Sequence, residues 1–76
     1  MFEKAKLKKA IKESKKQIEF LEQKRSRSQA ALVSAILGNT QPDDKDVDYF
    51  NQFTEKIEAE RNNLHRLMAE LEKLGG

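Results

Sequence analysis

Apolar residues recur along the chain at alternating steps of four and three, in two separate stretches. The first stretch consists of Leu7, Ile11, Ser14, Ile18, Leu21, Arg25, Ser28, Leu32 and Ala35. The second consists of Phe50, Phe53, Ile57, Glu60, Leu64, Leu67, Leu71 and Leu74. This spacing places side chains on one face of an α-helix and is typical of helices that pack along heptad seams. The alternation with period two that is typical of strands is absent, so the sequence predicts an all-α fold with two long helices.

The residues that favour a break in the helix gather in the middle of the chain, at 38–44. Gly38 suits the left-handed position that closes a helix, and Pro42 suits the start of the next one. Asp43, Asp44 and Asp46 can cap free N–H groups and meet the positive end of that helix. The sequence therefore predicts one helical-hairpin domain over 1–76, with a helix at about 3–37, a turn at 38–42 and a helix at about 43–74.

Folding the chain at this turn lays the two seams against each other in antiparallel, coiled-coil-like register. The expected apolar pairs are Leu7 with Leu74, Ile11 with Leu71, Ile18 with Leu64, and Leu32 with Phe50. Near the middle the pattern weakens, because Leu21 faces Glu60 and Arg25 faces Ile57. We expect Arg25 and Glu60 to lie close enough to pair and to form a polar layer, which lowers stability but sets the register.

Residues 30–37 are apolar around nearly the whole helix, so a single partner helix cannot cover them. We expect Val33 and Leu37, with Tyr49 and Phe53 from the second helix, to form an exposed apolar patch. Phe20 also lies off the seam, where it can extend the same interface or pack under Lys and Gln stems. Self-association about a two-fold axis into a four-helix arrangement would cover the patch. A homodimer and a tetramer, and closed or domain-swapped hairpins, all fit the pattern.

The net charge of +2 conceals a division between the two halves. Residues 1–28 carry ten Lys or Arg against four Glu (+6), and residues 29–76 carry five against nine acidic residues (−4). Opposite charges favour the antiparallel hairpin, although exposed pairs contribute only about 0–1 kcal/mol each. The alternative is that an anionic partner meets the basic face, which consists of Lys8, Lys12, Lys15, Lys9 and Lys16. Few arginines and no interleaved aromatics accompany these lysines, so a solvated face is the favoured interpretation over nucleic-acid binding.

Cysteine is absent, which excludes disulfides and thiolate metal sites and fits a cytoplasmic protein. The N-terminal residues offer no continuous apolar run of the kind found in signal peptides and membrane spans. Binding to a membrane surface is also disfavoured, because the second helix already covers the apolar stripe. We therefore expect no membrane association.

The residues required for catalysis or for binding a cofactor or metal do not assemble into a recognisable motif. His65 is the only histidine, and Asp43, Asp44, Asp46 and Asp48 lack the spacing and glycine of a calcium loop. We therefore expect a small non-enzymatic accessory protein without cofactors. The predicted function is protein–protein interaction, of the adaptor, co-chaperone or inhibitor type, with itself and with another protein. The alternative is a nucleic-acid-associating accessory protein that uses the basic face.

Overall fold

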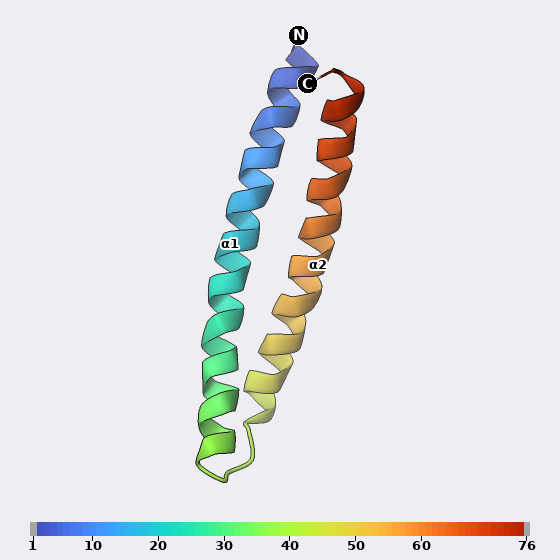
Figure 1. The fold of residues 1–76 in the computed structure, drawn as a ribbon. Helices are drawn as coiled ribbons and strands as arrows, with labels where there is room; N and C mark the ends of the chain where they lie inside the picture. Colours follow the sequence, from blue (N-terminus) through green and yellow to red (C-terminus); the bar gives the residue numbers. More distant parts are fainter. Residues whose placement is uncertain (1, 76) are drawn as a thin grey trace.

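The chain forms a rod of two antiparallel helices. The computed structural model describes residues 2–75, with α1 at Phe2–Leu37 and α2 at Asp44–Lys73. The helices lie side by side along their length, with the turn at one end and both chain ends at the other (Figure 1). The rod measures 57 × 16 × 14 Å along its principal axes. The predicted all-α hairpin is confirmed, and each helix boundary lies within one residue of its predicted position.

The end of α1 is closed by Asn39 and not, as predicted, by Gly38. Asn39 has a φ of 56°, and its N–H donates to the carbonyl of Ile36 at 3.1 Å. The N–H of Thr40 donates to the carbonyl of Ala35 at 2.9 Å. These two bonds form a Schellman motif, whose left-handed residue is usually glycine and sometimes asparagine. The expectation for Gly38 was wrong because asparagine tolerates the left-handed region better than most residues do, and here it occupies that position.

Substitutions at these two positions should therefore have opposite effects on stability. Gly38→Ala should raise the free energy of unfolding by about 0.4–1 kcal/mol, because alanine restricts the unfolded chain. The added Cβ would meet only the carbonyl oxygens of Ser34 at 3.4 Å and Ala35 at 3.8 Å. Asn39→Ala should lower the free energy of unfolding by about 1–2 kcal/mol, since alanine disfavours a positive φ. Urea denaturation followed by circular dichroism measures both, and the reverse order would contradict the assignment of Asn39.

Asp43 begins α2 by capping it. Its backbone is extended, and its side-chain Oδ1 accepts a hydrogen bond from the N–H of Lys45 at 3.1 Å. Asp44 and Asp46 follow in the first turn, where their charges meet the positive end of the helix. The cluster of aspartates thus acts locally, as the sequence indicated, and it fixes the point at which the chain re-enters a helix after the turn.

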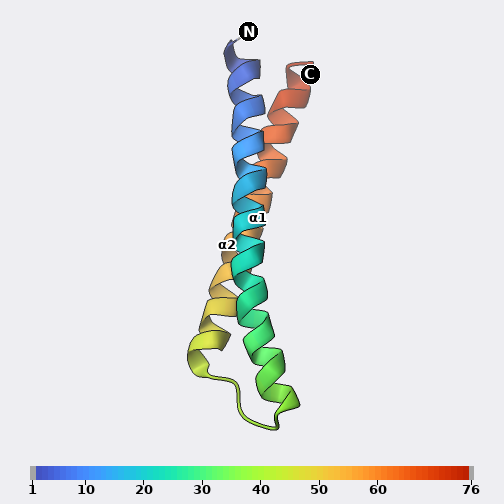
Figure 2. The same cartoon turned by 90° about the vertical axis from the view of Figure 1, so that its left-hand side faces the viewer.

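The two helices wind around each other, so that they lie side by side in one view and overlap in the middle of the other (Figures 1 and 2). Burial is greatest in the middle of the rod, since Ile57 is 0% exposed while Leu74 at the open end is 46% exposed. The other apolar residues of the core are Ile11, Ile18 and Leu21. The sequence predicted apolar layers from end to end with a weaker middle. The structure reverses this gradient, because neighbouring turns cover a residue in the middle of the rod from both directions, whereas a residue at an end is covered from one direction only.

The predicted register is confirmed at the open end of the rod. Leu7 and Leu74 line one hollow, and Ile11 and Leu71 line another. These are the pairs expected when the chain reverses at residues 38–43. The register therefore follows from the two seams and the length of the turn.

Ser14 occupies a core position in the seam of α1. Its side chain is buried, and its hydroxyl has no hydrogen-bond partner. A buried polar group without a partner costs about 1–3 kcal/mol. Ser14→Ala should therefore raise the free energy of unfolding by about 1–2 kcal/mol.

The matched control for this prediction is Ser26→Ala on the exposed surface of the same helix, with both variants measured at a concentration where the chain is monomeric. It should gain only the difference in helix propensity, about 0.5 kcal/mol. Equal effects of the two substitutions in urea denaturation would show that Oγ of Ser14 carries no desolvation cost.

Candidate functional site

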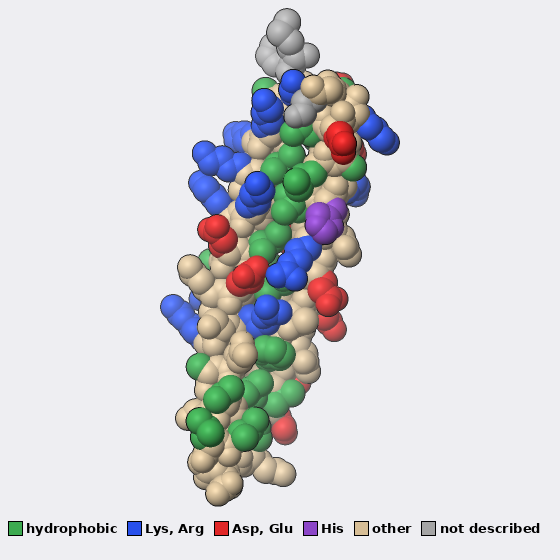
Figure 3. Space-filling view, in the orientation of Figure 1, with side chains coloured by type: hydrophobic (Ala, Val, Ile, Leu, Met, Phe, Trp, Pro, Cys, Tyr) green, Lys and Arg blue, Asp and Glu red, His purple; other side chains and the backbone are tan. Residues whose placement is uncertain are grey.

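Large apolar side chains remain exposed at the turn end of the rod. They are Val33, Ile36, Leu37, Val47 and Tyr49, and Leu37 is the most exposed at 81%. Figure 3 shows hydrophobic side chains gathered at this end of the visible face and Lys and Arg side chains concentrated toward the other end. A surface of this kind is typical of a site that contacts another protein.

Part of this surface is a shallow hollow on the side of α1 that faces away from α2. It is lined by Ser26, Gln29, Ala30, Val33, Ser34 and Leu37, which all belong to α1. The lining combines the small residues Ser26, Ala30 and Ser34 with the larger Val33 and Leu37. None of the six carries a charge, so we call this surface the α1 hollow.

Tyr49 and Phe53 form a separate apolar site on the flank of α2, which we call the aromatic flank. Their rings stack with centroids 6.4 Å apart, and the ammonium of Lys56 lies 5.8 Å from the centroid of Phe53. Tyr49 is exposed, whereas Phe53 is half-buried. Val33 and Leu37 were predicted to join these rings in one patch. Val33 and Leu37 line the α1 hollow and the two rings do not, so the common patch stays a prediction.

Phe20 lies outside both sites. It is half exposed, and the ammonium of Lys24, one turn further along α1, lies 5.3 Å from the centroid of its ring. This arrangement agrees with the interpretation that Phe20 packs under a lysine stem. Phe20 is not among the residues that line the α1 hollow.

The polar layer in the middle of the rod differs from the expected pair. Arg25 and Glu60 are both half-buried, but the guanidinium of Arg25 lies 5.9 Å from the centroid of the Phe50 ring. Among residues 2–75, the ion pair between the helices joins Nη2 of Arg61 to Oε1 of Glu22 at 3.4 Å. The expected contact between Arg25 and Glu60 is therefore corrected. The face of the Phe50 ring attracts the half-buried guanidinium of Arg25 in place of a carboxylate.

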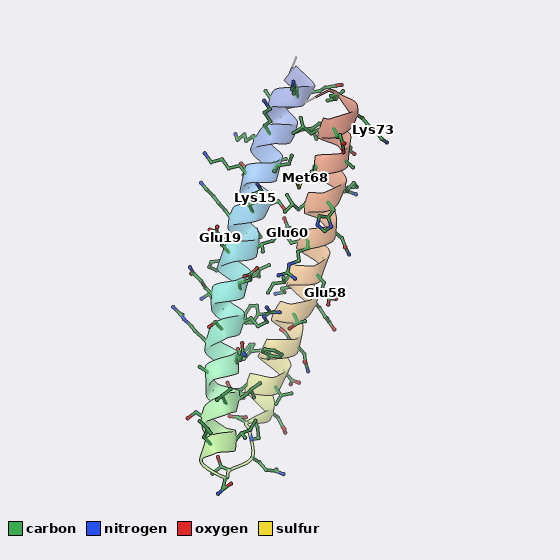
Figure 4. The ribbon with its side chains drawn as sticks, in the orientation of Figure 1. Lys15, Glu19, Glu58, Glu60, Met68 and Lys73 are labelled. Atoms are coloured by element: carbon green, nitrogen blue, oxygen red, sulfur yellow. The ribbon has the colours of Figure 1, made fainter. Side chains whose placement is uncertain are left out.

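The five lysines of the predicted basic face are all exposed: Lys8, Lys9, Lys12, Lys15 and Lys16. Within the described part of the chain, none of them forms a salt bridge. Lys15 borders a hollow with Ile11 and Met68, and Figure 4 shows Met68 reaching toward α1 from α2. The basic face thus carries exposed positive charge, with Glu72 of α2 lining the same hollow as Lys15.

The described residues contain no cluster of three or more His, Cys, Asp or Glu side chains that could hold a metal ion. His65 is exposed on α2. Neither described helix has a stretch long and apolar enough to cross a bilayer.

The exposure of Ile36 and Val47 was missed by the sequence interpretation. Ile36 follows Gln29 at a heptad spacing, on the side of α1 next to the seam. Val47 stands one step before the seam of α2, in the first turn of that helix. The exposure of Ile36 could have been found from its place on the helical wheel, whereas that of Val47 depends on how closely α1 covers the start of α2.

Comparison with protein-family models, curated proteins and solved structures finds no match for this chain.

Proposed function

We propose that this chain is a non-enzymatic protein–protein interaction module that docks by packing helix against helix at its turn end. The single observation that carries the proposal is the uncharged α1 hollow, with Leu37 81% exposed at its edge. In a chain with 37% charged residues, such a surface is costly to leave in water. A partner helix that covers it removes this cost.

The area of the rod supports the same proposal. The chain exposes 6148 Å². A compact protein of 8.8 kDa exposes about 4,800 Å², so the rod carries roughly 1,300 Å² more than its mass requires. A standard protein interface buries about 800 Å² on each partner. The surplus is thus large enough for an interface of ordinary size.

The proposal includes self-association into a homodimer, in which four helices lie together, as well as docking on the helices of another protein. The aromatic flank is the second contact surface. Tyrosine combines a large apolar ring with a polar hydroxyl and is enriched in interfaces for this reason.

Sedimentation over a range of concentrations, combined with titration of a hydrophobic dye, tests the proposal. We expect the average mass to rise with concentration and the dye to bind at low concentration, where the α1 hollow is free. A chain that stays monomeric, remains fully helical and binds no dye would overturn the proposed function.

A second candidate function is association with nucleic acid through the basic face. The observation in its favour is that the lysines of this face are exposed and form no salt bridge among residues 2–75. A row of lysines can follow a phosphate backbone, and each neutralised phosphate makes the affinity more sensitive to salt.

Titration of DNA and of RNA at two salt concentrations tests this candidate. Substitution of Lys8, Lys12 and Lys15 by Glu should abolish binding if the basic face carries it. The matched control replaces the three exposed lysines of α2, which are Lys45, Lys56 and Lys73. Absence of binding by the unmodified chain at low salt would remove this candidate.

A further inference from the structure

We infer that the α1 hollow receives the α1 hollow of a second copy of this chain, with the two α1 helices antiparallel about a two-fold axis. The inference rests on the proposed function and names its partner and its geometry. The resulting dimer overlaps only at the turn ends, and the two basic ends point in opposite directions.

The shape of the α1 hollow is complementary to itself in this orientation. The small residues Ser26 and Ala30 lie toward one end of the hollow, and the larger Val33 and Leu37 lie toward the other. An antiparallel partner brings its Leu37 over Ser26 and its Val33 over Ala30. Because the contact is two-fold symmetric, each such pair occurs twice.

The charge on the same side of α1 excludes the parallel alternative. Ser26 and Val33 belong to a row of residues spaced by alternating steps of four and three along one side of α1. The same row begins with Lys8, Lys12 and Lys15. In a parallel dimer each of these exposed lysines would oppose its own copy, which is unfavourable. In the antiparallel dimer, the partner's helix ends before it reaches them.

The segment opposite the end of each hollow is also free of charge. Residues 38–42 of the turn contain no charged side chain, and Asp43, the last residue of the turn, caps α2. Residues 38–42 would lie beyond Ser26 of the other copy, next to the polar layer. Among residues 26–42 the charged residue is Arg27, which does not line the α1 hollow.

The extent of the contact predicts a weak dimer. The α1 hollow covers residues 26–37, about 18 Å of helix. A contact of that length between two helices is at the small end of specific interfaces, and it forms and dissociates readily. The aromatic flank lies on α2, outside the contact, and stays open to another partner.

The absence of cysteine from the sequence makes a direct test possible, because every disulfide then comes from an introduced pair. Two variants, Ser26→Cys and Leu37→Cys, are prepared separately, mixed and oxidised gently. The antiparallel dimer brings residue 26 of one copy to residue 37 of the other. Equivalent residues stay about 16 Å apart, beyond the reach of a disulfide. We expect the mixed disulfide to exceed either homodimer by at least about tenfold.

The matched control replaces Leu37→Cys in the mixture by Glu58→Cys, an exposed position of α2 outside the hollow (Figure 4). It measures cross-linking by random collision. Circular dichroism of the reduced variants shows that each remains folded.

The outcomes separate this inference from the function on which it rests. Efficient homodimers of the two single-cysteine variants would overturn the antiparallel geometry and leave the interaction function standing. Suppose that cross-linking is no better than in the Glu58→Cys control, while Val33→Gln abolishes dye binding. This result would overturn the second copy as the partner and would retain the α1 hollow as a docking surface. A monomer without dye binding would overturn both.

Discussion

Replacing Ile57 by Ala should lower the free energy of unfolding by about 2–5 kcal/mol, the largest effect expected from a single substitution in this chain. Ile57 is 0% exposed and lies near the middle of α2. Its side chain therefore loses contacts on all sides when it is truncated, and two rigid helices cannot collapse to fill the space. A domain of this size has a total stability of about 4–11 kcal/mol, so the variant loses a large fraction of it.

Urea denaturation at a concentration where the chain is monomeric measures this loss. The matched control is Ile36→Ala, the same chemical change at a side chain that is 63% exposed. It should change the free energy of unfolding by less than about 0.5 kcal/mol. If Ile57→Ala does not fold, Ile57→Val should still show a loss of about 0.5–1.5 kcal/mol. Equal effects at positions 57 and 36 would contradict Ile57 as the centre of the core.

Replacing Val33 by Gln should weaken self-association by roughly tenfold to a hundredfold. Val33 lies in the α1 hollow and is 46% exposed in the single chain. Its burial against a second copy would contribute about 1 kcal/mol, and the two-fold axis doubles that contribution. Glutamine is a better helix former than valine, so the fold of the hairpin should be retained.

Sedimentation of Val33→Gln over a concentration series measures the change in the dissociation constant. Met68→Gln is the matched control, because Met68 is 47% exposed but lies toward the open end of the rod. It should leave self-association unchanged. Equal weakening by both variants would show that exposed apolar area in general, and not the α1 hollow, drives the association.

The two ends of the rod have different chemistry, and this bears on how a module of this kind could act. One end offers an uncharged surface for packing, and the other carries exposed lysines. If the turn ends join two copies, the basic ends lie far apart on an elongated particle. An anionic partner could then be held at both ends while the centre is fixed by helix packing.

Much of the candidate site could be predicted from the sequence, because burial in a two-helix rod depends on one repeating spacing. Val33 and Leu37 were identified as exposed since one neighbouring helix cannot cover the whole circumference of 30–37. The stacking of Tyr49 on Phe53 and the approach of Lys56 to the Phe53 ring could not be predicted. They depend on side-chain conformations on α2, which the spacing alone does not set.

The sequence by itself determined the two helices, the position of the turn and the register of the seams. These depend on local preferences and on a heptad spacing that repeats along both halves. Only the tertiary structure decided that Ile57 is the centre of the core, that Glu22 pairs with Arg61, and that the ring of Phe50 receives Arg25. The physical reason is that the heptad spacing assigns each side chain to a face of its own helix but not to a partner on the other helix. Which side chains meet depends on the distance and rotation of both helices together.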